Sequence, residues 1–391
     1  MMLNLDKSAW KRVAFGDVVR NVNETVRDLE AAGIDRIIAM EHLDPGELKV
    51  SRWGSTDAGR TFTRRVKPGQ TLFGKRRAYQ RKAAYAEFDA ICSGDIYTFD
   101  ADETQLRRDL LPFIVQSEGF FEHALGTSAG SLSPRTNWRD LKDFEFNLPS
   151  FEEQTRMADL LWAIERHKRT LADEVESVQG VLARVAATRL SALPTTARLG
   201  DLTTTRSGPS FPASDVHGES VEGSVPVIGI PNTKPDGTID LEGVGHVTGL
   251  PASVSTIDES SLILIRTNGN RQRIGNVYIP PEAAHGHAVS AFQFLMRAND
   301  MSDRDYLFWV LSEAGMQHRM SDAASGTVGL GNLAVRWLNE LEIPWTELPE
   351  ERRAFVETLG TLRDGLARLR AEVAAVTAVG KVVLGEMLGG S

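Results

Sequence analysis

The stretch FVETLGTLRDGLARLRAEVAAVTAVGKVVLGEM, residues 355–387, decides the architecture that this sequence predicts. Its apolar residues alternate in steps of four and three, with one gap at Gly380. Heptads sustained over several turns predict a long helix whose apolar seam packs against a second helix. The seam residues are Phe355, Leu359, Leu362, Leu366, Leu369, Val373, Val376, Val383 and Met387. A single amphipathic helix that lies on its own domain is the alternative interpretation.

A second helix of the same kind is expected near the middle of the chain. Its seam is interrupted at Lys168 and consists of Ile164, Leu171, Val175, Val178, Leu182 and Val185. Pro194 ends it, because proline cannot continue a helix. The two helices are similar in length and pattern, so we expect them to pair as an antiparallel coiled coil. At 1.5 Å per residue, roughly 38 helical residues span about 57 Å, enough to hold two domains apart.

The chain also contains an internal repeat. The stretch 37–40 returns as 227–230, a shift of 190, and each copy ends in one of the long helices. The same shift equates Leu72 with Leu262, Arg76 with Arg266 and Arg81 with Arg271. A shift of 195 equates Phe113, Ser117, His123, Glu145 and Pro149 with Phe308, Ser312, His318, Glu340 and Pro344. Such a repeat predicts two similar globular units in a fixed spatial relation, as in a protein that acts as a molecular ruler.

Each copy is predicted to be a mixed α and β unit, so the fold class is α+β. Short apolar stretches separated by turn residues predict strands at 34–40, 72–73 and 91–99, and at 225–230, 261–266, 275–279 and 288–296. Helices are expected at about 103–125 and 303–320. The predicted domains are 1–148, a helix at 149–194, a second globular domain at 195–343 and a second helix at 344–391.

Composition points to an ordinary intracellular protein. No apolar run approaches the roughly 20 residues that span a bilayer, and no signal peptide is evident. Cys92 is the single cysteine, which excludes an intrachain disulfide and a cysteine-based zinc cluster. We therefore expect a cytoplasmic protein.

The charge of the chain is unevenly distributed. The net charge of −9 argues against a nucleic-acid binder, but between Arg60 and Lys82 the sequence has nine basic residues and no acid. Phosphate binding depends on the field within a Debye length of about 8–10 Å. This run, interleaved with Phe73 and Tyr79, therefore favours nucleic acid, and a solvated basic surface is the alternative.

Several motifs resemble the specificity subunit of type I restriction-modification systems. The stretch Leu148-Pro149-Ser150-Phe151-Glu152-Glu153-Gln154-Thr155-Arg156-Met157-Ala158 is similar to the P-P-L-x-E-Q-x-x-I-A start of that family's spacer helix. Ile343-Pro344 with Leu348-Pro349-Glu350-Glu351-Arg352 is a looser version with three extra residues. Residues 75–82 with 93–96 resemble a stretch of the first recognition domain, and 266–271 with 274–275 resemble its second counterpart. The resemblance covers essentially the whole chain.

The resemblance implies two target recognition domains, each of which reads one half of a bipartite DNA site. The paired helices would set the length of the unread gap and offer docking surfaces for two DNA-methyltransferase subunits, to which restriction subunits can be added. A specificity subunit of a methylation-only defence complex is also compatible with it. Phage defence is the implied biological role.

Candidate DNA-contacting residues follow from the chemistry of base edges and phosphates. Arg and Lys match guanine, Asn and Gln match adenine, and phosphate contacts position the protein without reading sequence. In the first domain the candidates are Arg64, Arg65, Lys75, Arg76, Arg77, Gln80, Arg81 and Lys82. In the second they are Arg266, Asn268, Asn270, Arg271, Gln272 and Arg273, for which a solvated turn is the alternative.

No catalytic motif is evident, so we expect a non-catalytic targeting subunit without cofactor or metal. An adenine methyltransferase would show Asn/Asp-Pro-Pro-aromatic, whereas Pro280-Pro281 follows Ile279. The glycine-rich stretch 326–332 lacks the Lys-Ser/Thr pair of a P-loop. His285 and His287 have no evident partners for a metal. The competing hypothesis is a coiled-coil adaptor that assembles proteins without reading DNA; the basic run and the donor-rich stretch 266–273 argue against it.

Overall fold

The computed structural model describes residues 6–56, 62–326 and 330–388, which form two compact units. Unit 1 comprises Met1–Asp173 and Arg370–Ser391, and unit 2 comprises Glu174–Leu369. Each unit therefore contains a part of both long helices. Within the described ranges, no helix combines the length and apolarity needed to cross a bilayer.

Unit 1 is built on two four-stranded sheets and one strand pair. The first sheet is antiparallel, in the order β2 (Val19–Val22), β9 (Ile96–Ala101), β6 (Thr71–Gly74) and β7 (Ala83–Tyr85). The second has the order β4 (Gly54–Ser55), β3 (Arg36–Ile38), β8 (Ala90–Cys92) and β5 (Arg64–Val66), with β3 and β8 parallel. The strand pair is β1 (Lys11–Ala14) with β10 (Glu145–Leu148).

Unit 2 repeats the antiparallel sheet strand for strand and the parallel pair of the second sheet, whereas the outer strands β5 and β13 have no counterparts among the described strands of the other unit. Its antiparallel sheet has the order β12 (Thr203–Ser207), β20 (Gln293–Ala298), β16 (Ser261–Ile265) and β18 (Val277–Tyr278). Its second sheet has the order β13 (Val216–His217), β15 (Gly245–Val247), β14 (Val225–Ile228) and β19 (Ala288–Val289), with β14 and β19 parallel. The pair β11 (Thr195–Arg198) with β22 (Glu342–Trp345) matches β1 with β10, and β17 (Thr267–Asn268) pairs with β21 (Gly331–Asn332). The α+β class and the duplication are confirmed, but the strand pairs equate Glu145 with Glu342, so the predicted match of Glu145 with Glu340 was wrong.

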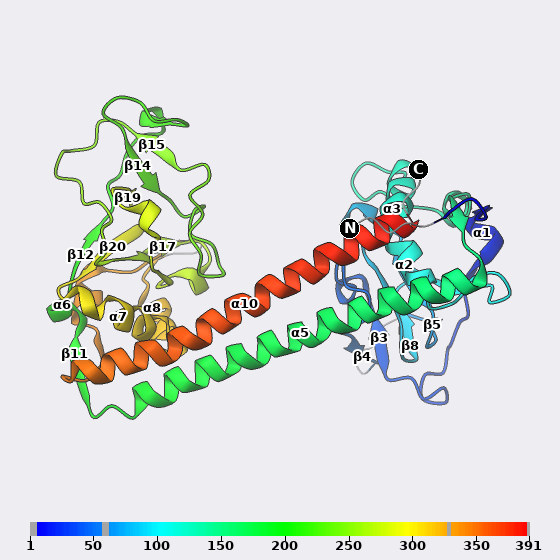
Figure 1. Ribbon diagram of the computed structural model, residues 1–391, viewed down its shortest axis with the longest axis horizontal. Helices are drawn as coiled ribbons and strands as arrows, with labels where there is room; N and C mark the ends of the chain where they lie inside the picture. Colours follow the sequence, from blue (N-terminus) through cyan, green and yellow to red (C-terminus); the bar gives the residue numbers. More distant parts are fainter. Residues whose placement is uncertain (1–5, 57–61, 327–329, 389–391) are drawn as a thin grey trace. The chain divides into compact units, whose positions relative to one another are not determined.

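Short helices cover the antiparallel sheet of each unit (Figure 1). Unit 1 has α1 (Phe15–Val18), α2 (Leu111–Gln116), α3 (Glu118–Gly126) and α4 (Trp138–Leu141), and α2 packs on β6 and β7. Unit 2 has α6 (Leu199–Leu202), α7 (Arg304–Ser312), α8 (Ala314–Ala323) and α9 (Val335–Glu340), and α7 packs on β16, β18 and β20. Single 3₁₀ turns are η1 (Met40–His42), η3 (Ala78–Gln80), η4 (Ala213–Asp215), η5 (Arg271–Arg273), η6 (Glu282–Ala284) and η7 (Met301–Asp303).

Helices occur in both predicted ranges, 103–125 and 303–320, but each range contains two helices and the first of them begins only at Leu111. Ser117 has extended backbone between α2 and α3, and its hydroxyl accepts a hydrogen bond from the Phe120 amide. Glu313 plays the same part between α7 and α8, where its carboxylate accepts from the Met316 amide. A side chain that caps a new helix favours the end of the preceding one. Ser117 is thus equivalent to Glu313, not to Ser312.

The sheets also correct the register of the repeat by one residue. Phe73 pairs with Tyr97 and Leu264 pairs with Phe294, so the structure equates Phe73 with Leu264, a shift of 191. Leu72 therefore matches Ile263, and its predicted match with Leu262 was wrong. Side chains alternate between the faces of a strand, so a slip of one residue exchanges the faces. Leu72 faces the cluster that contains Ile38, whereas Leu262 faces the other side of its sheet, toward the helices.

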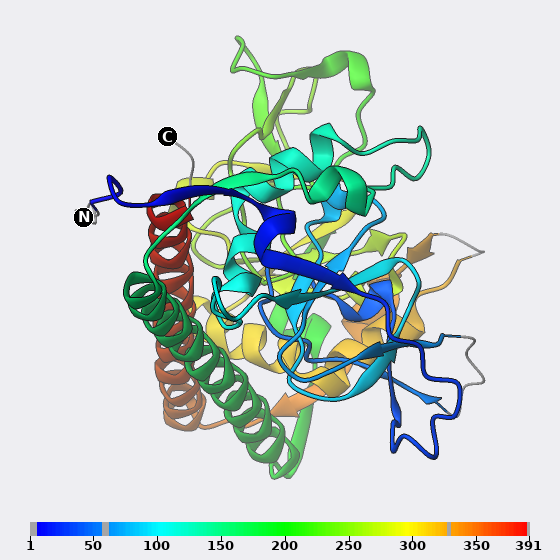
Figure 2. The ribbon, with the colours of Figure 1, turned by 90° about the vertical axis from the view of Figure 1, so that its right-hand side faces the viewer.

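The long helices are α5 (Phe151–Ser191) and α10 (Pro349–Leu388), and they run antiparallel in each unit. In unit 1, the start of α5 shares a core with the end of α10, through Met157, Leu161 and Met387. In unit 2, the end of α5 shares a core with the start of α10, through Leu190 and Phe355. Figure 2 shows the two helices side by side. The predicted antiparallel pairing is confirmed.

Both irregularities of the heptad pattern lie in unit 1 and have a structural reason. Lys168 interrupts the seam of α5, and its ammonium lies 3.1 Å from the Glu165 carboxylate. Gly380 interrupts the seam of α10, and a Cβ atom there would lie only 3.2 Å from Ile164 Cγ2. The absent side chain at position 380 therefore makes room for the seam residue of the partner helix.

A buried polar side chain ties the first turns of each long helix to the globular part of its unit. In unit 1, Gln154 donates to the Gln105 and Pro149 carbonyls and accepts from the Arg107 amide. In unit 2, the Arg352 guanidinium donates to Asp303 at 2.7 Å and to the Thr346 carbonyl at 2.6 Å. Both side chains are almost fully buried, at 1% and 7% exposure for Gln154 and Arg352.

Replacing Arg352 with methionine is expected to destabilise unit 2 by about 3 kcal/mol, because Asp303 then stays buried without its cation. The double variant Arg352→Met with Asp303→Leu should recover most of that loss, because no uncompensated charge remains. Urea unfolding of both variants measures the effect. Arg336→Met, which breaks the exposed ion pair with Glu340, is the control and should change stability by less than about 1 kcal/mol. Equal losses for Arg352→Met and the control would contradict the anchoring role.

Candidate nucleic-acid interface

The connection between β6 and β7 in unit 1, residues 75–82, carries most of the predicted cations of the first domain and is held at several points. The Lys75 amide donates to the Asp95 carbonyl and the Lys75 carbonyl accepts from the Thr136 amide, at 2.9 Å each. The Arg77 amide donates to the Pro134 carbonyl at 2.8 Å. The Lys82 ammonium donates to the Met40 carbonyl at 2.6 Å. The backbone of this connection is thus pinned on both sides.

The basic run is free of acids in the sequence but not in space. Arg65 pairs with Asp89 at 2.9 Å and with Glu24 at 3.2 Å. Arg81 forms a bidentate ion pair with Glu118, whose pKa the Arg81 guanidinium lowers. These acids come from segments far away in the sequence, so the local composition overstated the positive field. Arg60, the first residue of the run, lies outside the described residues.

A group of cations remains around Asp95 and Tyr97. Arg76 lies 2.9 Å and Arg135 lies 3.8 Å from the Asp95 carboxylate. The Lys75 ammonium lies 5.1 Å and the Arg64 guanidinium 6.0 Å from the centre of the Tyr97 ring. Burial and the neighbouring Arg64 lower the pKa of Lys75.

Four cations gather here, and only Arg76 and Arg135 form ion pairs with Asp95 among the described residues, so the surface is locally positive. We call Arg64, Lys75, Arg76 and Arg135 the Asp95 cluster. Sequence reasoning missed Arg135, because it lies in a polar turn far from the basic run. Its backbone bridge to Arg76 brings it into the cluster.

The equivalent connection in unit 2, residues 266–276, presents donors that are not paired with acids. The Arg266 guanidinium donates to the Ser207 hydroxyl at 3.1 Å and lies 5.4 Å from the Phe294 ring centre. Arg271 donates to the Ala324 carbonyl, and Arg273 donates to the Thr233 carbonyl. Across the described ranges, no acid forms an ion pair with any of these three arginines.

The amides of this connection shape its backbone. The Asn268 side-chain oxygen accepts from the Asn270 amide at 2.8 Å, and the Asn270 oxygen accepts from the Gln272 amide at 3.1 Å. Asn side chains commonly stabilise turns in this way. Gln272 is exposed, and its side chain has no partner in the part of the chain that the structure describes.

The hydrogen-bond pattern equates Lys75 with Arg266, and not Arg76 with Arg266 as predicted. The Arg266 amide donates to the Phe292 carbonyl and its carbonyl accepts from the Leu333 amide, as those of Lys75 do with Asp95 and Thr136. Lys75 and Arg266 also each lie over an aromatic ring of the neighbouring strand, Tyr97 in β9 and Phe294 in β20. The predicted match of Arg81 with Arg271 was wrong as well, because Arg81 follows η3 whereas Arg271 begins η5.

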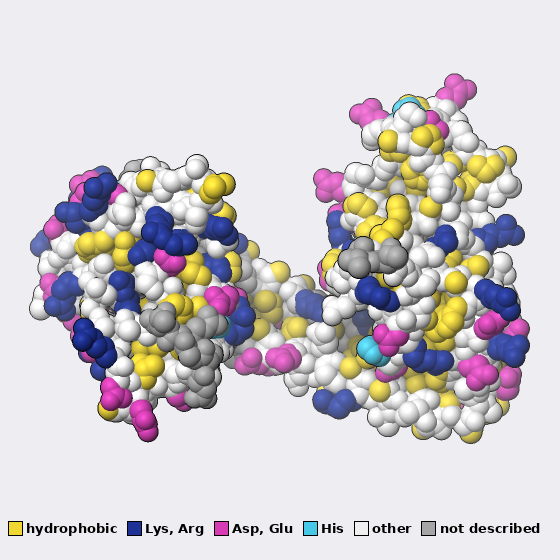
Figure 3. Space-filling model, turned by 180° about the vertical axis from the view of Figure 1, so that it is seen from behind, with side chains coloured by type: hydrophobic (Ala, Val, Ile, Leu, Met, Phe, Trp, Pro, Cys, Tyr) yellow, Lys and Arg dark blue, Asp and Glu magenta, His cyan; other side chains and the backbone are white. Residues whose placement is uncertain are grey.

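Figure 3 shows Lys and Arg side chains of each unit interspersed with Asp and Glu. The face that Figure 3 shows is thus of mixed charge. This distribution agrees with the net charge of −9. Any anion that binds here has to be recognised locally, because the long-range field of such a chain is not attractive to phosphate.

Two weaker motifs of the sequence are the histidine pair His285 and His287 and the glycine-rich stretch 326–332. His287 is half-buried, and burial lowers its pKa. No group of three or more His, Cys, Asp or Glu residues with metal-binding geometry occurs in ranges 6–56, 62–326 and 330–388. The glycine-rich stretch 326–332 is described only in part, because residues 327–329 lie outside the described ranges.

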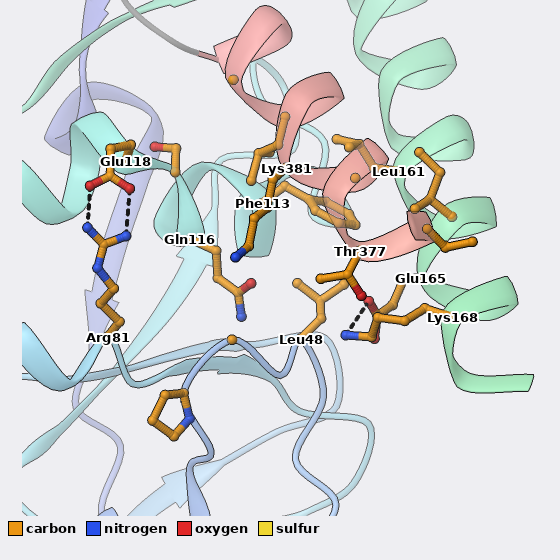
Figure 4. A pocket seen from close by; sticks show the side chains of 18 of the residues that line it. Leu48, Arg81, Phe113, Gln116, Glu118, Leu161, Glu165, Lys168, Thr377 and Lys381 are labelled. Atoms are coloured by element: carbon orange, nitrogen blue, oxygen red, sulfur yellow. Dashed lines mark hydrogen bonds and ion pairs between the residues drawn. The ribbon is translucent and has the colours of Figure 1, made fainter. Parts of the chain in front are cut away.

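Unit 1 also contains a pocket of about 510 Å³ between its globular part and the two long helices (Figure 4). Its wall is mainly apolar, with Leu48, Phe113 and Leu161, and Glu165 and Lys168 lie at one side. One Glu165 oxygen is buried without a hydrogen-bond partner among the described residues. Burial raises the pKa of Glu165, although the Lys168 ammonium opposes the shift.

Glu165→Gln is expected to flatten the pH dependence of stability. The folded pKa of Glu165 lies above its unfolded value, so stability falls as pH rises from about 4.5, the unfolded value, through the folded pKa. The glutamine side chain cannot ionise, so the stability of the variant should not fall in this pH range for that reason. Urea unfolding between about pH 4 and pH 8 measures it. Glu152→Gln, exposed on the same helix, is the control. Parallel pH profiles for Glu165→Gln and the wild type would refute the assignment.

The comparisons with known proteins agree with this architecture. No protein-family model matches the chain, and no curated protein sequence matches it. A solved chain from work on complex assembly and conformational transition of the type I R-M system superposes with a TM-score of 0.58, at 16% identity over 96% of both chains. The S subunit of a type I restriction-modification system from M. genitalium superposes with a TM-score of 0.60, at 15% identity, covering 100% of this chain and 99% of that one. The resemblance read from the sequence motifs is thus confirmed at the level of the fold, and this chain has the fold of a type I restriction-modification S subunit.

Proposed function

We propose that this chain is the DNA sequence-recognition subunit of a type I restriction-modification complex. The observation that carries the proposal is a duplicated framework with unlike loops. The connections 75–82 and 266–276 leave equivalent strands, β6 and β16, yet their side chains differ. A device that reads two different half-sites needs such a constant framework with variable contact residues. The shared fold with S subunits supports the same conclusion.

In this proposal, residues 1–148 and 195–343 are the two target recognition domains. The helices at 149–194 and 344–391 are spacers that set the gap and dock two methyltransferase subunits, to which restriction subunits can be added. The complex acts in the cytoplasm, and the chain itself performs no catalysis. Its partners are double-stranded DNA and these enzymes, and it needs no cofactor.

The proposed contacts divide into two kinds. The Asp95 cluster and Arg266 are suited to phosphate, because each holds a cation beside an aromatic ring at a fixed place on its sheet. Among the other predicted contacts, Arg65 and Arg81 are engaged by carboxylates, which weakens their case as primary DNA contacts. The side-chain amide groups of Asn268, Asn270 and Gln272 donate no hydrogen bond to a described residue, and such donors suit base edges.

The competing function is a coiled-coil adaptor without DNA recognition. An adaptor requires the paired helices but gives no role to the donor-rich connection at 266–276. A specificity subunit of a methylation-only complex would have the same DNA contacts and differs only in lacking restriction partners. The proposal therefore concerns mainly the recognition of DNA by this chain, and the presence of restriction subunits is a separate part of it.

The central experiment maps modified adenines in a host that expresses this chain together with the methyltransferase of its system. We expect a bipartite motif with a fixed gap that appears only when both proteins are present. The control host expresses the methyltransferase alone. Methylation that is absent, or that is unaffected by this chain, would favour the adaptor.

Replacing Arg266 with glutamine should weaken DNA binding of the chain–methyltransferase complex and lower the salt dependence. A lost phosphate contact reduces the slope of log K against log salt by about 1. Glutamine keeps a donor for Ser207, so the fold of the connection should survive. Arg336→Gln, exposed on α9, is the matched control. An unchanged affinity and slope for Arg266→Gln would remove this residue from the phosphate contacts.

A further inference from the structure

The connection 75–82 contains an unusual backbone feature. Arg77 has φ 54° and ψ 56°, and Arg81 has φ 51° and ψ 45°, which place both in the left-handed region. They are the only non-glycine residues with positive φ in the described part of the chain. An L-residue is strained there, whereas glycine is not. Such strain persists where the side chain or the backbone geometry serves a purpose.

The purpose of the Arg81 side chain is visible within the fold. Its guanidinium binds the Glu118 carboxylate with two hydrogen bonds and lies 5.4 Å from the centre of the Phe121 ring. These contacts connect the end of η3 to α3. An arginine at position 81 therefore offsets its strain by contacts inside unit 1.

The Arg77 side chain has no such contact. It is exposed, and no described residue forms a hydrogen bond, ion pair or ring contact with it. Glycine would satisfy the left-handed backbone at lower cost, so the structure of the free chain gives no reason for arginine here. The remaining role for this guanidinium is to bind a partner molecule.

The backbone around Arg77 holds it in one position. Its amide donates to the Pro134 carbonyl and its carbonyl accepts from the Gln80 amide, both at 2.8 Å. The neighbouring Arg76 pairs through its backbone with Arg135, within the Asp95 cluster. Because the backbone is pinned, only the side chain is ordered on binding, and its Cα stays at a fixed place, which favours geometric discrimination over simple charge attraction.

We propose that Arg77 is a specificity-determining residue that reads a guanine of the first half-site in the major groove. The planar guanidinium matches the O6 and N7 acceptors of guanine with two hydrogen bonds. Its chain neighbours Lys75 and Arg76 belong to the Asp95 cluster, which supplies the phosphate contacts that fix the register. This inference rests on the proposed function and sharpens it, because it separates one base-reading residue from its phosphate-binding neighbours.

The test uses Arg77→Gly and Arg77→Lys in the full chain, co-expressed with the methyltransferase. Glycine relieves the left-handed strain, so Arg77→Gly should fold at least as well as the wild type. We expect the methylation motif to become degenerate at one base pair of one half-site, while the other half and the gap stay unchanged. In competition binding with duplexes that carry each base at that pair, discrimination should fall on the order of 5- to 150-fold.

Arg77→Lys keeps the charge and the strain but loses the planar fork. Arg77→Lys should lower the base specificity at the same base pair. If the glycine variant fails to assemble, the lysine variant alone tests whether Arg77 reads a base. Arg27→Ala, which removes an exposed arginine elsewhere in unit 1, is the control and should leave the motif intact.

The outcomes separate the two proposals. A wild-type chain that directs no methylation would defeat the proposed function itself. A normal wild-type motif that stays unchanged in the Arg77 variants would overturn only the base-reading role. A uniform loss of modification at all sites, with a weaker salt dependence of DNA binding, would also overturn the base-reading role, because a lost phosphate contact has this effect.

Discussion

The antiparallel seam between α5 and α10 is the constraint on which the rest of the structure depends. It requires that the last helix of the chain returns to the first unit, where Met387 is buried beside Met157 and Leu161. Each unit therefore contains parts of both helices, and residues near the C-terminal end of α10 belong to the core of the first unit. The buried anchors Gln154 and Arg352 then fix the globular part of each unit to the start of a helix. Each joint between a globular part and the start of a long helix is thus made by hydrogen bonds of a buried side chain.

The same helices differ in how they meet the two units. The seam of unit 1 contains both of its irregular positions, Lys168 and Gly380, and these line one pocket with Glu165. A buried carboxylate with a raised pKa is a costly feature of an otherwise apolar interface. Unit 2 uses a compact charged anchor, Arg352 with Asp303, where unit 1 uses the neutral amide of Gln154. The duplication thus preserves the framework while the polar contacts within it have diverged.

The candidate DNA contacts show why local composition is an incomplete guide to charge. The acid-free run of the sequence meets Glu24, Asp89 and Glu118 in the folded unit, because strands and helices from distant segments pack beside it. Coulomb interactions depend on distance in space, so a count along the chain overstates the field. What remains is a small positive group around Asp95, together with Arg77, whose strain and isolation distinguish it from its neighbours.

The sequence alone determined the large-scale plan, because heptads and a repeat are periodic signals that survive without knowledge of packing. The seam residues, the antiparallel pairing and the equivalence of Ile37 with Val227 follow from such signals. Only the tertiary structure decided the register elsewhere. A slip of one residue, as between Leu72 and Ile263, is invisible in a loosely similar repeat but exchanges the two faces of a strand. Likewise, only packing decides which cations pair with carboxylates and which can bind a partner. The fold, and not the order of residues in the chain, brings each carboxylate next to a cation.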